Sequence, residues 1–146
     1  MVSTSFWDDS WVAELEPTQK YLFLYLLTNP LTNISGVYEV RTERIVFDSG
    51  LKKSEVTETL SAFEKAGKIV RESSWIGIVN FTKHQSLNPK VKRGIVNELR
   101  KAPTALVDKM SLPKEIGCTL MTEQSPSKVK SLKPVLSEFR KDMIRR

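Results

Sequence analysis

The sequence is poor in the residues that build disulfide-linked, metal-binding and membrane proteins. It holds one cysteine, Cys118, and one histidine, His84, among 146 residues. A single cysteine cannot form an internal disulfide and fits a reducing cytoplasm. One histidine without a cysteine pair nearby excludes the common zinc patterns, so we expect no metal site. No apolar run approaches the roughly 18 residues that a membrane-spanning helix needs, and we expect no membrane partner.

Motifs of catalysis are missing as well. The sequence contains no G-x-x-x-x-G-K phosphate loop, no dinucleotide fingerprint and no nucleophile elbow. The pair Asp8-Asp9 is better explained as a helix cap than as a metal dyad, because carboxylates stabilise the positive end of a helix. The N-terminal stretch MVSTSFWDDSW lacks the basic start and apolar core of a secretory signal. We therefore expect a cytoplasmic protein that is not an enzyme and uses no cofactor.

Positive charge is present, and it is clustered. The formal net charge is +6. Residues 83–101 carry six Lys or Arg and one Glu, and residues 128–146 carry seven Lys or Arg and two Asp or Glu. Such blocks are typical of surfaces that bind nucleic acid, and they also occur on helices that only face solvent. Charge alone leaves both interpretations open.

The clearest pattern in the chain lies in residues 41–81. Gly50 and Gly67 each follow a helical stretch, and glycine readily adopts the positive φ that ends a helix. We therefore predict helices at about 42–49 and 53–66. The runs KIVRE and WIGIVNF that follow are rich in β-branched and aromatic residues and predict a hairpin. Helix, turn, helix and hairpin is the order of a winged helix-turn-helix.

The apolar spacing of the flanking segments fits the same fold. In the second helix Val56, Leu60 and Phe63 recur at spacings of four and three and predict a buried stripe. Pro17 begins a strongly apolar helix that we expect at the centre of the core. Residues 36–40 predict a short strand that joins the hairpin as a third, edge member.

We expect an α+β, mainly helical fold: a winged helix-turn-helix with a two- or three-stranded wing sheet over residues 1–110. Residues 111–127 contain Pro, Gly and Ser without a period and predict a linker. Residues 128–146 recover helical spacing and predict a basic amphipathic helix. Because so short a helix is marginal alone in water, it must dock on its own domain, on a second copy or on a partner, and its apolar stripe is the predicted partner-binding surface. The stripe consists of Leu132, Leu136, Phe139 and Met143.

Three stretches, YLLTNP, TNISGVYE and NFTKHQSLNPKV, carry a resemblance that covers about residues 3–103. Over this range the chain resembles the N-terminal winged-helix domain of phage replisome-organiser and DnaD-like replication-initiation proteins. The resemblance implies a role at phage or prophage replication origins, with DNA binding, self-association and delivery of the host helicase loader and helicase. Full-length relatives carry a second domain with a Tyr-x-x-x-Ile-x-x-x-Trp motif that binds single strands. This chain departs from that pattern after about residue 103.

Two surfaces are predicted to contact duplex DNA, together with the hairpin. Lysines and hydroxyls near a helix N-terminus engage phosphates and base edges, while Glu55 and Glu58 oppose phosphate. The first surface, on the second helix, consists of Lys52, Lys53, Ser54, Thr57 and Ser61. The second follows the hairpin, where basic side chains would neutralise several phosphates. It consists of Lys83, His84, Lys90, Lys92 and Arg93.

Two other functions remain open at this point. In the first, the chain is a protein-interaction adaptor that self-associates or docks on a host replication protein, with the terminal helix as recognition element. In the second, it is a transcriptional repressor on the same scaffold, which requires a palindromic site and a stable dimer. The sequence shows no obvious dimer zipper.

Overall fold

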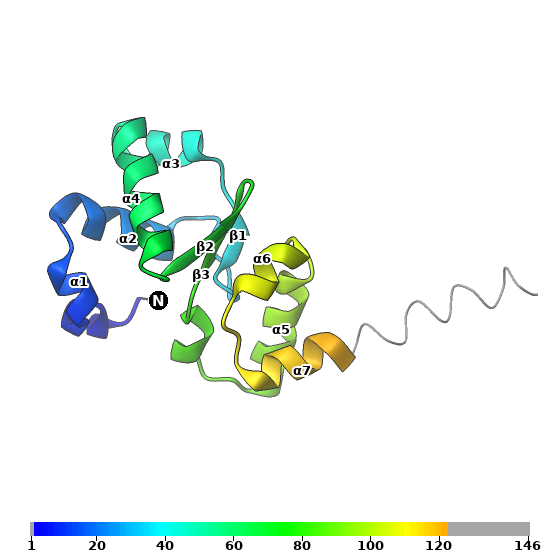
Figure 1. Ribbon diagram of the computed structural model, residues 1–146. Coiled ribbons are helices and arrows are strands. Elements are labelled where there is room, and N and C mark those ends of the chain that lie inside the picture. Colours follow the sequence, from blue (N-terminus) through cyan, green and yellow to red (C-terminus); the bar gives the residue numbers. More distant parts are fainter. Residues whose placement is uncertain (1, 123–146) are drawn as a thin grey trace, which may run out of the picture. The chain divides into compact units, whose positions relative to one another are not determined.

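The computed structural model describes residues 2–122. It is mainly helical with one small antiparallel sheet, so the α+β class is confirmed. The chain divides into two compact units, Met1–Ser111 and a second beginning at Leu112. The first unit (Figure 1) contains η1 Thr4–Asp8, α1 Ser10–Glu14, α2 Pro17–Thr28, β1 Val37–Glu39, α3 Thr42–Ser49, α4 Lys53–Lys65, β2 Ile69–Glu72, β3 Trp75–Ile78, η2 Phe81–His84, α5 Pro89–Leu99 and α6 Thr104–Lys109.

The N-terminal helices begin where capping residues allow them to begin. Asp9 caps α1, because its Oδ1 accepts the backbone N–H groups of Trp11 and Val12 at 2.9 and 3.2 Å. Pro17 opens α2, as predicted. The inner face of α2 is buried and forms the centre of the core. It consists of Leu22, Phe23 and Leu26.

The predicted helix, turn, helix segment is confirmed almost residue for residue. Gly50 ends α3 with a φ of +71°, and Gly67, also at +71°, follows α4. The stripe of Val56, Leu60 and Phe63 on α4 is buried against α2 and the sheet. Arg71 of β2 links the sheet to α4 by donating two hydrogen bonds to Glu64 Oε2, at 3.0 and 3.1 Å.

The sheet has the strand order β1-β3-β2, so the predicted third strand is confirmed as an edge member. Tyr38 pairs with Ile76, whereas their neighbours Val37 and Val70 both pair with Gly77. Successive side chains of a strand point to opposite faces. Tyr38 and Ile76 therefore face the core cluster of α2 and α4, and Val37, Val70 and Gly77 face the other side.

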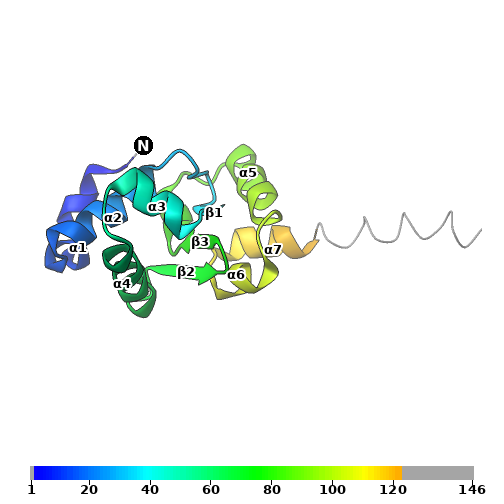
Figure 2. The ribbon, with the colours of Figure 1, turned by 90° about the horizontal axis from the view of Figure 1, so that it is seen from above.

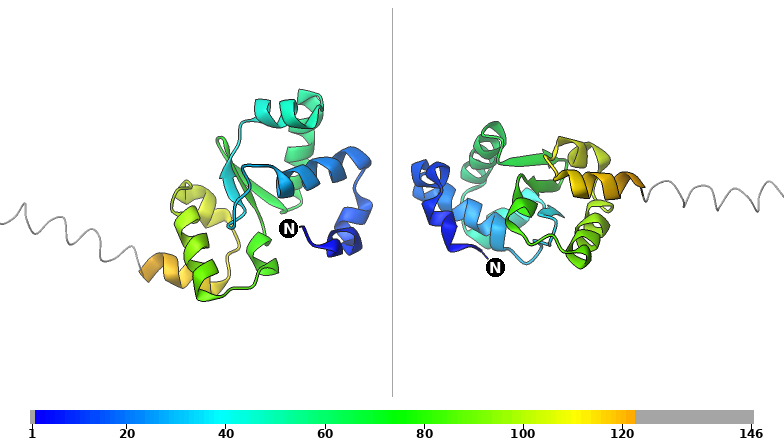
Figure 3. Two further views of the ribbon diagram at one scale, coloured as in Figure 1. Left: turned by 180° about the vertical axis from the view of Figure 1, so that it is seen from behind. Right: turned by 90° about the horizontal axis from the view of Figure 1, so that it is seen from below.

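The second face of the sheet is covered by α5 and α6 (Figures 1 and 2; Figure 3 shows the same layers from behind). Asn88 caps α5 by accepting the Val91 N–H at 2.9 Å. Met110, just after α6, lies so near Gly77 that a Cβ there would be 2.6 Å from its Sδ. The buried side chains of these two helices are Ile95, Val96, Leu99 and Leu106. The hairpin is thus packed on both faces.

The linker prediction for residues 111–127 is wrong for 114–122. These residues form α7, Lys114–Thr122, in the second unit. The Pro113 carbonyl starts the helix by accepting the N–H groups of Ile116 and Gly117 at 3.0 and 3.1 Å. Proline ahead of a helix and one glycine within it are both tolerated, the latter at about 1 kcal/mol. The predicted partner stripe (Leu132, Leu136, Phe139, Met143) lies outside the described residues.

Candidate functional site

The outer surface of α4 carries the first group of predicted DNA contacts. Lys52, Lys53, Ser54 and Thr57 are exposed there, and Ser61 is half-buried. The structure also gives several of these groups partners inside the protein. Glu55 accepts the Lys52 N–H at 3.0 Å, and the Thr57 hydroxyl donates to the Lys53 carbonyl at 2.8 Å.

The charge on this surface is largely balanced locally. Lys53 Nζ lies 3.6 Å from Glu43 Oε1, and both side chains are 70% exposed. The Glu43 carboxyl accepts a hydrogen bond from its own backbone N–H, which lowers its pKa most, and the nearby Lys53 ammonium lowers this pKa further. Glu58 is exposed on the same helix. Of the predicted cations on α4, only the Lys52 ammonium has no carboxylate partner among residues 2–122.

Hydrogen bonds from two tyrosines of α2 hold α3 against α2 and so position α4. The Tyr25 hydroxyl and the Arg44 Nε both donate to Asp48 Oδ2 at 2.7 Å. Hydrogen bonds from the Arg44 guanidinium, the larger cause, and from the Tyr25 hydroxyl lower the pKa of Asp48. Burial, the larger cause, and the hydrogen bond to Asp48 raise the pKa of Tyr25. The Tyr21 hydroxyl adds a 3.1 Å bond to the Ser49 carbonyl at the end of α3.

The outer face of α5 carries the second group. Lys90, Arg93 and Asn97 are exposed at spacings of three and four, so they share one face of the helix. Lys92 is half-buried and has an interaction of its own within the protein. No carboxylate of the described chain pairs with Lys90 or Arg93. This face of α5 therefore presents two cations that no carboxylate of the described chain neutralises.

The structure does not bring the two predicted groups into one patch. Helix α4 packs on β2 from one side of the sheet, and α5 lies on the other side (Figures 1 and 2). Lys83 and His84 are exposed on η2, which follows β3. A duplex that contacts α4 and a duplex that contacts α5 would therefore approach the protein from different directions.

The tip of the hairpin is acidic. Glu39 and Glu72 both pair with Trp75 at the end of the sheet. The Ser74 hydroxyl donates to Glu39 Oε1 at 2.7 Å, and Lys109 Nζ lies 2.8 Å from Glu72 Oε2. Glu72 is thus paired with a cation, whereas Glu39 is exposed and opposes phosphate at this end of the sheet.

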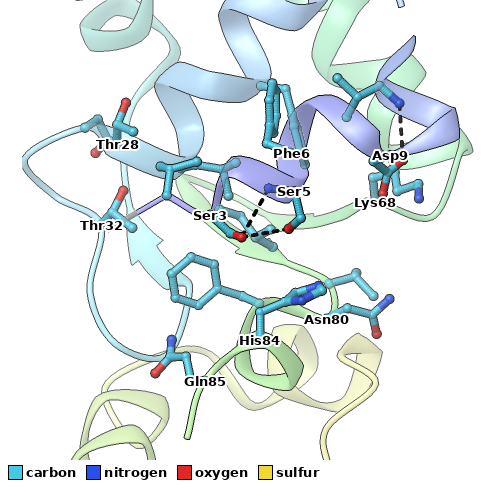
Figure 4. Close-up of a pocket in the computed structure, with 18 of the residues that line it drawn as sticks. Ser3, Ser5, Phe6, Asp9, Thr28, Thr32, Lys68, Asn80, His84 and Gln85 are labelled. Carbon is cyan, nitrogen blue, oxygen red and sulfur yellow. Dashed lines mark hydrogen bonds between the residues drawn. The ribbon is translucent and has the colours of Figure 1, made fainter. Parts of the chain in front are cut away.

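A cavity of about 760 Å³, which sequence analysis missed, lies between η1, the end of α2 and η2 (Figure 4). Ser3 and Ser5 reach it from the N-terminal segment, and Asn80 and His84 reach it from the segment after the hairpin. Of these residues only His84 was predicted to be functional. The contributing segments are far apart in the sequence, and no motif or period links them, so only the fold reveals the cavity.

Residues 2–122 contain no group of three or more His, Cys, Asp or Glu side chains that would hold a metal ion. Among the helices of the same residues, none has the length and apolar character to cross a membrane. Comparison of the chain with known protein families, with characterised proteins and with solved structures found no match.

Proposed function

We propose that this chain is a winged-helix DNA-binding module of phage-type replication initiation, and that it binds duplex DNA. The order of α3, α4, β2 and β3, with β1 as a third strand, supports this fold. The sequence resemblance to phage replisome organisers supports the role. The single observation that carries the proposal is the basic face of α5, with Lys90 and Arg93 exposed and unpaired by carboxylates of residues 2–122.

In this proposal α5 binds the phosphate backbone without reading its sequence. Each phosphate that Lys90 or Arg93 neutralises releases bound counterions, which makes the affinity depend steeply on salt. Sequence preference would come from α4, where Lys52 supplies phosphate contact and Ser54 is exposed to reach base edges. Since the two helices lie on opposite sides of the sheet, we expect their contributions to be separable.

The test measures duplex-DNA affinity over a series of salt concentrations. For Lys90→Ala/Arg93→Ala we expect the slope of log K against log salt to become shallower by about 2, since each lost phosphate contact removes about 0.9. Lys52→Ala should make the same slope shallower by about 1. Lys109→Ala is the matched control, because it removes a cation that is bound to Glu72. Failure of the wild-type protein to bind duplex DNA at low salt would reject the proposal.

One observation favours the alternative of a protein-interaction adaptor. Phe47 on α3 is 84% exposed, an unusual position for a large apolar ring. If α3 binds a second copy or a host replication protein, Phe47→Ser should abolish that association while the salt slope for duplex DNA stays unchanged. Sedimentation velocity of wild type and variant, alone and with the helicase loader, measures the difference.

A further inference from the structure

The cavity between η1 and η2 has the size and lining of a ligand site. Its volume, about 760 Å³, lies within the range of small-molecule sites, roughly 300 to 1,000 Å³. It is separate from the outer faces of α4 and α5 on which the proposed duplex binding rests. Of the residues predicted to contact DNA, only His84 lines it.

Aromatic rings from different parts of the chain form its apolar walls. Trp11 and Phe81 are only half-buried, so parts of their rings stay accessible. Trp11 packs edge-to-face on Phe23, with ring centroids 5.0 Å apart. The backbone of Gly36 holds Phe81 from behind, because a Cβ there would lie 2.5 Å from its Cγ. Both accessible rings are therefore fixed by packing.

Part of the polar lining makes no hydrogen bond within the described chain. The Asn80 amide and the His84 imidazole make no hydrogen bond to any described residue, although both line the cavity (Figure 4). Asn80 stands at the N-cap of η2 but makes no cap bond, so its donor and acceptor are both available. Gln85 donates from its Nε2 to the Ile34 carbonyl at 2.9 Å, which leaves its Oε1 as an acceptor.

The charged groups argue against a cationic ligand and for an anionic end. Among the described residues Asp9 is the only carboxylate of the lining, and its Oδ1 already accepts two N–H groups of α1. Lys68 is the only lysine among them, with its Nζ over the Trp11 ring, 4.7 Å from the ring centre. The site thus combines fixed rings, a free amide and one cation over the Trp11 ring.

We propose that this cavity binds a nucleobase, carried either by a free nucleotide or by an unpaired position of a single strand. Every base has a π-face that stacks on aromatic side chains, and its edge requires neutral donors and acceptors. Trp11 and Phe81 supply the rings, Asn80 reads the edge and Lys68 binds the phosphate. His84 donates to or accepts from the ligand at the mouth of the cavity.

Tryptophan fluorescence provides a local signal for the test. In a Trp7→Phe/Trp75→Phe background Trp11 is the sole tryptophan, and a stacked base would quench it. The probes are adenosine monophosphate, a short single-stranded oligodeoxyadenylate and ribose 5-phosphate, which carries the phosphate without a base. Asn80→Gly removes the amide, and glycine keeps the positive φ of 65° that this position adopts. Asn97→Ala removes the same group from the exposed face of α5 and is the matched control.

We expect quenching by the base-containing probes and about tenfold weaker binding in Asn80→Gly, with Asn97→Ala unchanged. His84→Ala, at an exposed position, should weaken binding in the same direction. Quenching by adenosine monophosphate identifies a free nucleotide as a ligand, and quenching by the oligomer alone identifies a strand. The proposal is overturned if no probe quenches, if ribose 5-phosphate quenches equally, or if Asn80→Gly behaves like Asn97→Ala. Lys90→Ala/Arg93→Ala weakens duplex binding only, so failure here is distinct from failure of the proposed function.

Discussion

The two faces of the small sheet are closed by different kinds of packing. On the face toward α2 and α4, four rings interlock: Phe63 lies 5.4 Å from Phe23 and 5.5 Å from Trp11, and Phe6 stacks on Phe23 at 6.1 Å. On the face toward α5 and α6, the side chains are aliphatic, and the centre of the sheet is Gly77. One side fills its space with large rings, and the other brings a helix close to the backbone.

The surfaces outside these two layers also differ. On the α4 side Lys53 has Glu43 within reach, and of the predicted cations there only the Lys52 ammonium has no carboxylate partner in the described chain. On the α5 side no carboxylate of the described chain pairs with Lys90 or Arg93. The ring-filled side is therefore the better candidate for stability and specific contacts, and the aliphatic side is the better candidate for phosphate binding.

The largest expected effect is the loss of a ring from the α4 side. Phe63 is 1% exposed and contacts both Trp11 and Phe23. Phe63→Ala should lower the free energy of unfolding by about 3–5 kcal/mol, because a cavity replaces the ring. Denaturant unfolding followed by circular dichroism measures the change. The control is Phe47→Ala on the exposed face of α3, which should stay within about 0.5 kcal/mol. Equal losses would contradict the packing described for α4.

The α5 and α6 side is tested by two glycines with opposite expectations. A Cβ on Gly77 would lie 2.6 Å from Met110 Sδ and 3.0 Å from Val70 Cγ2, so Gly77→Ala should destabilise the protein by about 1–2 kcal/mol. Gly94→Ala on α5 meets only Ile34, at 3.8 and 4.0 Å, and should stabilise by about 0.5–1 kcal/mol. Thermal unfolding compares the two. A Gly77→Ala protein as stable as wild type would show that the layers are not in close contact.

The contrast between the faces also separates what the sequence predicts from what it does not. The α4 side was predictable because its signals are local: Gly50 and Gly67 mark helix ends, and Val56, Leu60 and Phe63 keep a helical period over two turns. The edge strand at residues 37–39 was predictable for the same reason. Each of these patterns lies within a few residues of the structure it specifies.

The remaining features depend on contacts between distant segments. Nothing local to Gly77 shows that Met110 will cover it, so the packing of the hairpin on both faces could not be predicted from its sequence. Charge counting along the sequence also could not show that the two predicted DNA surfaces, on α4 and α5, lie on opposite sides of the sheet (Figure 2). The cavity gathers Ser3, Asn80 and His84 from distant positions, and the periodicity of single segments cannot report such convergence.

A hydroxyl buried on the ring-filled side is expected to have a smaller, pH-dependent effect than the loss of the Phe63 ring. Tyr38 is 3% exposed, donates to the Leu26 carbonyl at 2.8 Å and accepts from Asn29 Nδ2 at 2.9 Å. Burial raises its pKa from 10.0 to about 12. The folded state therefore keeps the proton after the unfolded state has lost it, so this stabilising contribution is complete below pH 10 and is lost as the pH rises toward 12. Tyr38→Phe should cost about 1 kcal/mol near neutral pH, and its deficit relative to wild type should shrink between about pH 10 and pH 12. Urea unfolding of both proteins across that range measures the difference. A constant deficit would show that Tyr38 ionises equally in both states and that this side of the sheet admits water.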